Sequence, residues 1–172
     1  MRKIFVFILS GSLLFCISCG NSGGMSDKAK KNLASAQAIS KMFESGDYSK
    51  IGDYIANNCV LHSDMGDVKG LDSIKTEFAG YSKTMSEMKN LAVKELADDD
   101  YVFQWLNESG KMNVDEMSMK AGQPYSFATI EVSKFNADSK VIEHWTFVNP
   151  TDMMKMMGQP TTSNMPDTTS KK

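Results

Sequence analysis

The sequence predicts an α+β fold, with three N-terminal helices packed on a curved, mainly antiparallel sheet that forms a cone. Two observations support this prediction. In the first third of the chain, apolar residues recur every three or four positions, as on one face of a helix. After residue 90 the period changes to short segments separated by turn residues, which is typical of an antiparallel meander. Helices followed by a sheet are the pattern of an α+β domain.

Three helices are expected, at about 29–46, 47–58 and 70–80. Each has apolar residues on one face and is bounded by a capping residue or by glycine or asparagine. The short apolar run at 59–62 is too brief for a helix, so we expect a strand there.

Five more strands are expected after the helices: Leu91–Ala97, Tyr101–Glu108, Met112–Met119, Tyr125–Phe135 and Val141–Val148. In the last two, both faces carry many apolar side chains, so the face turned away from the helices needs a second cover. We expect a symmetric homodimer to cover Trp145 and Phe147. The alternative is a monomer with scattered exposed apolar residues.

The first 19 residues predict export. Arg2 and Lys3 precede an apolar run that is too short to span a membrane, as in a secretory signal. Residues 16–19 resemble a bacterial lipoprotein cleavage box, which implies that Cys19 is acylated and becomes the new N-terminus. The protein would then be lipid-anchored in a bacterial cell envelope, facing the periplasm. An ordinary secretory signal without lipid is the alternative.

These segments divide the chain into a signal peptide (1–18), a lipidated flexible tether (19–26), a folded domain (27–158) and a disordered tail (159–172). Removing the signal leaves 17 basic and 21 acidic residues. The resulting net charge of about −4 argues against a nucleic-acid partner. Only Cys59 would remain as a free thiol, so no intrachain disulfide is expected.

Three motifs resemble those of SnoaL-like domains in the nuclear transport factor 2-like (cystatin-like cone) superfamily. They are Phe43–Tyr48 with the following Ile55–His62, Val68–Ile74, and Lys140–Trp145. The resemblance covers about residues 30–158 and implies the cone fold. It also implies a small apolar or aromatic ligand in the cone. A cyclase, isomerase or dehydratase, and a protein-interaction module with a filled cone, are the alternatives.

Four polar residues are candidates for the pocket: His62, Ser63, His144 and Thr146. Thr146 stands where many relatives have an aspartate, and Ser63 stands closest to the catalytic aspartate of the isomerases. Neither family mechanism therefore transfers, and the catalytic residues stay unassigned. A pair of histidines, or His144 oriented by a carboxylate, can move a proton near neutral pH, which is the enzyme hypothesis. Structural, hydrogen-bonded histidines are the alternative.

Aromatic and aliphatic residues are expected to line the cone: Tyr54, Phe78, Tyr101, Phe103, Phe127 and Ile142. Met153, Met156 and Met157 share one face of a short final helix, and we expect them to close its mouth as a lid. Copper(I) binding by these thioethers is the alternative. Two histidines without a third ligand at suitable spacing argue against a metal site, and no cofactor is expected.

Overall fold

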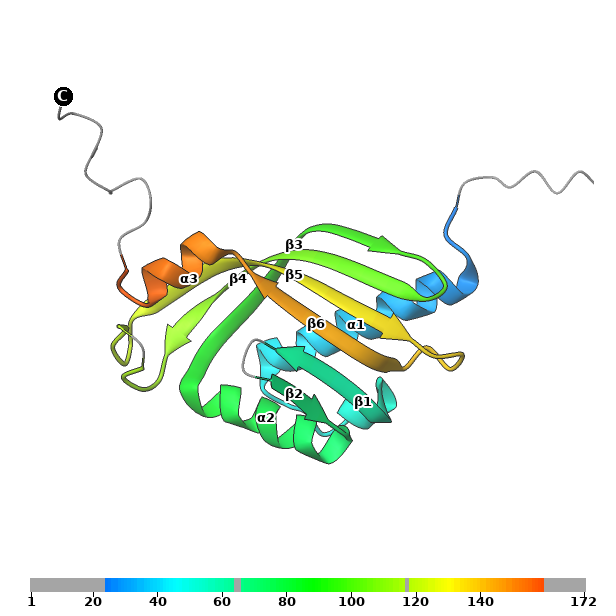
Figure 1. Ribbon diagram of the computed structural model, residues 1–172, viewed down its shortest axis with the longest axis horizontal. Coiled ribbons are helices and arrows are strands. Elements are labelled where there is room, and N and C mark those ends of the chain that lie inside the picture. The colour runs from blue at the N-terminus through cyan, green and yellow to red at the C-terminus, as the bar shows by residue number, and fades with distance from the viewer. Residues whose placement is uncertain (1–23, 64–65, 117, 160–172) are drawn as a thin grey trace, which may run out of the picture.

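The computed structural model describes residues 24–63, 66–116 and 118–159. It confirms the α+β class, because three helices pack on one six-stranded mixed sheet that is not closed (Figure 1). The expected signal peptide, the expected lipidation site Cys19 and the tail from residue 160 onward lie outside the described residues. Within the described part of the chain, no helix has the length and apolar character needed to cross a membrane.

Helix α1 (Asp27–Ser45) has well-defined ends. The Ser26 hydroxyl accepts a hydrogen bond from the Ala29 amide at 3.0 Å, which satisfies one of the free amides of the first turn. Gly46 ends the helix in a left-handed conformation with φ of +69°. Ala29 and Ala36 are buried where α1 packs against the sheet.

The expected second helix is wrong over most of its length. Only a 3-10 turn, η1 (Ile51–Asp53), forms there, and strand β1 (Ile55–Ser63) follows at once. Ile51 and Ile55 are both buried, but a turn that leads into a strand places them there as well as a helix would. A four-residue spacing of apolar residues over one turn therefore does not distinguish the two structures.

The chain then forms the short strand β2 (Gly66–Lys69) and the helix α2 (Leu71–Thr84). Helix α2 continues past Gly80, where the sequence suggested a stop, and its buried Phe78 packs into the core. The last helix is α3 (Pro150–Met156), which follows the final strand and has no buried residue.

The remaining strands are β3 (Met85–Ala97), β4 (Tyr101–Met112), β5 (Pro124–Phe135) and β6 (Val141–Val148). The order across the sheet is β2-β1-β6-β5-β4-β3. All neighbouring strands are antiparallel except β1 and β6, which run parallel. The expected strand at 112–119 is wrong, because β4 already ends at Met112 and a loop leads from there to β5.

Two apolar clusters hold the domain together at opposite ends of β4. The larger lies between the sheet and the helices and consists of Ala36, Ile51, Ile55, Cys59, Ile74, Phe78, Val102, Phe135 and Val141. The smaller consists of Met112, Met119 and Tyr125, with Met85, Met88, Phe127 and Met156 packed against it. Burial raises the pKa of the Cys59 thiol to about 12, so Cys59 acts as a small apolar residue.

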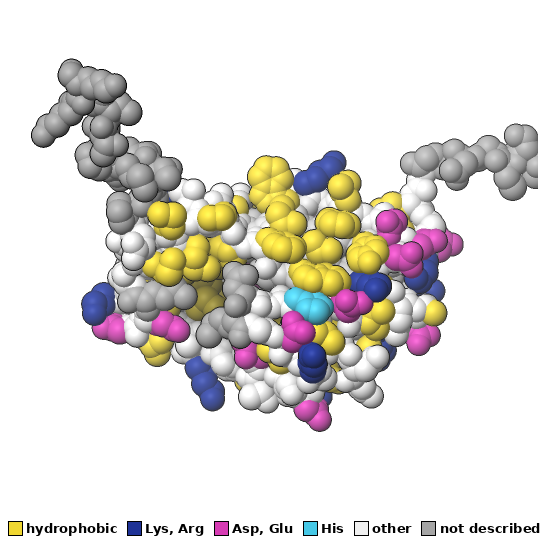
Figure 2. Space-filling view, viewed as in Figure 1, with side chains coloured by type: hydrophobic (Ala, Val, Ile, Leu, Met, Phe, Trp, Pro, Cys, Tyr) yellow, Lys and Arg dark blue, Asp and Glu magenta, His cyan; other side chains and the backbone are white. Residues whose placement is uncertain are grey.

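The face of the sheet turned away from α1 carries exposed apolar side chains. We call it the outer apolar face and define it by Leu96, Phe103, Trp105, Ile130 and Phe147. The register places Leu96 beside Phe103, Trp105 beside Ile130, and Ile130 beside Phe147. Figure 2 shows hydrophobic side chains gathered over this part of the sheet.

Candidate functional site

The inner face of the sheet, turned toward α1 and α2, brings together polar side chains from three adjacent strands. Their register forms two neighbouring rows, Val102–Ser133–His144 and Gln104–Glu131–Thr146. Alternate residues of a strand point to the same side, so all of these share the inner face with the core residue Val102. The rows lie between the two apolar clusters.

Glu131 and His144 are the centre of a hydrogen-bonded chain. His144 Nε2 lies 2.7 Å from Glu131 Oε2, and the Thr146 hydroxyl donates to the same oxygen at 2.7 Å. The Ser133 hydroxyl lies 2.9 Å from His144 Nδ1. If Nε2 carries the proton and donates to the carboxylate, Nδ1 accepts from Ser133, and every group has a partner. The cluster can therefore hold or exchange a proton.

Glu108 is the second carboxyl group of this interior. The hydroxyl of Thr129, which is 1% exposed, donates to Glu108 Oε1 at 2.7 Å. Burial, followed by the negative charge of Glu131, raises the pKa of Glu108 to about 7. The hydrogen bond from Thr129 and the positive charge of protonated His144 act in the opposite direction. Glu108 thus exchanges its proton near neutral pH.

Because the pKa of Glu108 is raised, we expect the free energy of unfolding to depend on pH. The substitution Glu108→Gln should remove this dependence. The folded protein binds the proton more tightly than the unfolded chain, whose glutamate pKa is about 4.5, so stability falls as the pH rises from 4.5 to 7. We expect the wild type to lose about 2–3 kcal/mol more than the variant over this range. Urea unfolding at a series of pH values measures the difference.

Glu116→Gln is the control, because Glu116 is exposed in the loop after β4. It should leave the pH dependence as in the wild type. Parallel curves for wild type and Glu108→Gln would mean that Glu108 titrates normally.

Two tyrosines lie in the field of these carboxylates. Burial, followed by the charges of Glu77, Glu131 and Glu108, raises the pKa of Tyr81 to about 12. Burial and the charge of Glu108 raise the pKa of Tyr125 to about 12. Both phenols are therefore neutral hydrogen-bond donors at neutral pH.

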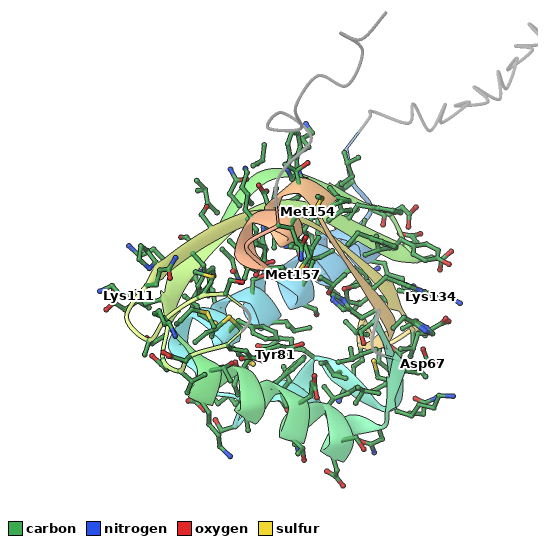
Figure 3. The ribbon with its side chains drawn as sticks, turned by 60° about the vertical axis from the view of Figure 1, so that its left-hand side comes forward. Asp67, Tyr81, Lys111, Lys134, Met154 and Met157 are labelled. Carbon is green, nitrogen blue, oxygen red and sulfur yellow. The ribbon has the colours of Figure 1, made fainter. Side chains whose placement is uncertain are left out.

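The interior is open to solvent between α2 and α3. Thr146 lies on the inner face and is nevertheless exposed, and Tyr81 is 38% exposed. Figure 3 shows Tyr81 projecting from α2 into the space between α2 and the sheet, with Met157 on the opposite side. In Figure 2 a recess containing hydrophobic side chains lies below α3. The side chains of His144 and Glu131 are 24% and 13% exposed, so solvent reaches this cluster.

Two surface hollows of about 430 and 380 Å³ lie elsewhere. One is at the start of α2, and the other is between the start of α1 and the turn at Asp98–Asp100. Both are shallow hollows of the surface. The interior cluster, with its interacting titratable groups, is the better candidate site.

The structure places some predicted pocket residues together. His144 and Thr146 alternate along β6, so they share the inner face as expected. Ile142 stands at a shift in register between Val141 and Glu143, and Val141 is the residue that is buried in the core there. Phe127 is half-buried beside Tyr125, with ring centroids 5.5 Å apart. Phe78 is fully packed in the larger core cluster, where its ring lies 4.5 Å from that of Phe43.

The expected proximity of His62 and His144 is wrong. In the parallel pairing of β1 with β6, Leu61 lies beside His144, and His62 lies beside Trp145 on the opposite face. The His62 ring stacks on Trp145 at 4.8 Å, and its Nδ1 lies 2.9 Å from Asp67 Oδ1. Because neighbouring residues of a strand point to opposite faces, a register one residue different from that assumed removes His62 from the interior.

Four other predicted residues also lie away from the cluster. Tyr101 and Phe103 are on the outer face, and Phe103 is 45% exposed, so they do not line the cone. Ser63 ends β1, where its hydroxyl donates to the Gly66 carbonyl at 2.8 Å. Tyr54 is half-buried after η1, and its carbonyl accepts from the Val141 amide at 2.8 Å, which joins η1 to β6.

The three methionines predicted as a lid lie at the open end of the cone. Met156 packs on the smaller apolar cluster, Met153 is half-buried, and Met157 is 42% exposed. The Ser118 hydroxyl donates to the Met157 carbonyl at 2.7 Å, which fastens the end of α3 to the loop after β4. Their role as a lid stays a prediction.

The sequence reasoning missed the two carboxyl groups of the site. Glu108 has the same strand parity as the buried Val102 and Leu106, and Glu131 has that of the buried Thr129 and Ser133. A glutamate at an inward position of an otherwise apolar strand face was the available signal. Which residues each glutamate contacts on the neighbouring strands could be known only from the register of the sheet.

Comparison with known proteins supports the fold of this site. A family model described as SnoaL-like polyketide cyclase matches residues 34–159. No curated protein matches the chain. The family match covers the site and all strands of the sheet.

Solved structures show the same fold at low sequence identity. A candidate SnoaL-like polyketide cyclase from Jannaschia sp. CCS1 has a TM-score of 0.68 at 14% identity, covering 80% of this chain and 98% of that one. An NTF2-like protein from Anabaena variabilis has a TM-score of 0.62 at 14% identity, covering 76% and 96%. An LEH-like epoxide hydrolase from M. tuberculosis has a TM-score of 0.63 at 10% identity, covering 76% and 91%.

Proposed function

The chain belongs to the SnoaL-like polyketide cyclase family, and from this premise we propose that its cone binds a small organic molecule at the cluster of Glu108, Glu131 and His144. The observation that carries the proposal is an accessible polar cluster on an inner face whose two ends are apolar. Such a site fixes a ligand by a few polar contacts and packs its remainder against apolar walls.

The flat rings of Tyr125 and Phe127 supply the apolar wall nearest the cluster. They are stacked at 21° beside the half-buried Met156. A flat or aliphatic ligand part can pack there while its polar group reaches Glu131 and His144. This keeps the ligand class expected from the sequence, a small apolar or aromatic molecule, and adds one polar group to it.

The experiment uses 1-naphthylmethanol as a fluorescent probe of the full-length protein. His144→Ala should weaken its binding by about 0.5–1.5 kcal/mol, or roughly three- to tenfold, because one hydrogen-bond partner is lost. A fluorescence titration of wild type and variant measures the two dissociation constants.

His62→Ala is the matched control, because His62 lies on the opposite face of the sheet. It should leave the dissociation constant of the probe unchanged. Equal weakening by both substitutions, or no binding to the wild type at millimolar probe, would contradict the proposal.

A proton-transfer enzyme is the second candidate. The observation that favours it is the raised pKa of Glu108, since general acid–base groups work best with a pKa near the working pH. Glu108 would exchange the proton, and the neutral phenol of Tyr81 would donate a hydrogen bond to developing negative charge. The pH-dependent unfolding of Glu108→Gln tests it, since a normally titrating Glu108 would remove its basis.

The same proposal includes the setting of the domain. Cys19 would be acylated, so that the cone faces the periplasm from a membrane of the bacterial envelope. Two copies would associate through the outer apolar face, which is supported by the exposure of Leu96, Trp105 and Phe147.

A further inference from the structure

The interior cluster has an electrostatic character that restricts its ligand. Two carboxyl groups, Glu108 and Glu131, lie on the inner face with one histidine. No hydrogen bond or ion pair within the described residues joins a lysine to either carboxyl group, and the single arginine, Arg2, lies outside them. Lys134, on the neighbouring strand, pairs with Glu143 on the outer face, at 2.7 Å. The site therefore has acidic groups without a lysine counterion.

Two tyrosines of this interior have a raised pKa. Burial is the largest cause for both; the charges of Glu77, Glu131 and Glu108 raise the pKa of Tyr81 further, and that of Glu108 raises the pKa of Tyr125 further. Both shifts mean that a further negative charge is disfavoured there. A carboxylate or phosphate ligand would meet the same penalty and would lose its hydration as well.

We propose that this site binds a small molecule with a protonated nitrogen, and that the Glu108 and Glu131 carboxylates select it over neutral and anionic molecules of the same shape. This inference rests on the proposed function, because it names the ligand class of the same site. An ammonium group donates to both carboxylates, and the faces of Tyr81 and Tyr125 attract a cation.

Binding of such a ligand is coupled to proton release. The ligand keeps its proton, while the proton held by Glu108 leaves for the solvent, because the ammonium group replaces it as the positive partner of Glu131. The groups that face Glu108 are Thr129 and Glu131 from β5 and His144 from β6. From α2, Tyr81 lies in the same field and stands beside Glu77. Affinity for the cation should therefore rise with pH through neutrality.

The test uses three probes with one skeleton: 1-naphthylmethylamine, 1-naphthylmethanol and 1-naphthoate. Titrations of the full-length protein at pH 8 should rank them amine, alcohol, carboxylate in decreasing affinity. Lowering the pH to 6 should weaken amine binding by roughly tenfold, because one proton competes with it, and should leave alcohol binding nearly unchanged. Calorimetry in two buffers of different ionisation enthalpy should detect the released proton.

Glu108→Gln identifies the residue responsible. The variant should lose both the preference for the amine over the alcohol and the pH dependence of amine binding. Glu143→Gln is the matched control, because Glu143 lies on the outer face and pairs with Lys134. It should keep the wild-type ranking.

The outcomes separate this inference from the proposed function. If the alcohol binds at the His144 site and the amine binds no more tightly, the ligand class is wrong and the proposed function stands. If the carboxylate binds as tightly as the amine, the ligand class is also wrong. If none of the three binds at millimolar concentration, both proposals fall.

Discussion

Phe147→Glu is expected to convert a dimer of this protein into a monomer. Phe147 is 57% exposed on the outer apolar face and lies beside Ile130, which is 39% exposed. In a single copy the new carboxylate stays in water, so the domain should still fold. In a dimer that buries this face the charge would be unpaired, which costs about 3–5 kcal/mol, or over a hundredfold in the dimer dissociation constant.

Sedimentation velocity of wild type and variant at micromolar concentration measures this change. Val114→Glu is the control, because Val114 is similarly exposed, at 39%, in the loop after β4 and outside the face. It should sediment as the wild type does. A wild type that is already monomeric at these concentrations would refute the dimer.

The second large effect concerns attachment to the membrane. Cys19→Ser should move the protein from the membrane fraction to the soluble fraction, because the proposed anchor is the acyl group on Cys19. Several acyl chains hold a protein far more firmly than the single chain that gives marginal binding, so the wild type should resist high salt. Cell fractionation before and after a salt wash measures both.

Cys16→Ser is the matched variant, since Cys16 is the other cysteine of the cleavage box and is removed with the signal peptide if Cys19 is acylated. It should stay in the membrane fraction. If Cys19→Ser stays in the membrane fraction and Cys16→Ser is released from it, the lipidation site is Cys16 and not Cys19. Retention of both would leave the cleavage box without support.

The sequence was sufficient for those parts of the fold that repeat a pattern over many residues. Helix α1 and strands β5 and β6 were expected within a few residues of their observed bounds, because each has a long period and a clear turn or cap at its end. The prediction of a second helix failed because the apolar spacing of Ile51 and Ile55 spans only one turn.

The candidate site was predicted in part. The alternation of β6 placed His144 and Thr146 on the inner face, because parity within one strand needs no partner. His62 and Phe103 were misplaced because parity gives two faces without saying which is inner, and that depends on the register with β6 and β5. Glu108 was missed for a related reason, since its raised pKa arises from Glu131 on another strand.

The parallel pairing of β1 with β6 sets the order in which this domain can be completed. Leu61 on β1 pairs with His144 on β6, so more than half of the domain must be synthesised before these two strands can pair. Until then β1 has only the short β2 beside it, and one edge of β5 is also open. Contacts so distant along the chain slow folding and leave strand edges free to pair with other chains. Export of this chain N-terminus first, as proposed, would therefore leave a long interval in which chaperone protection raises the yield of folded protein.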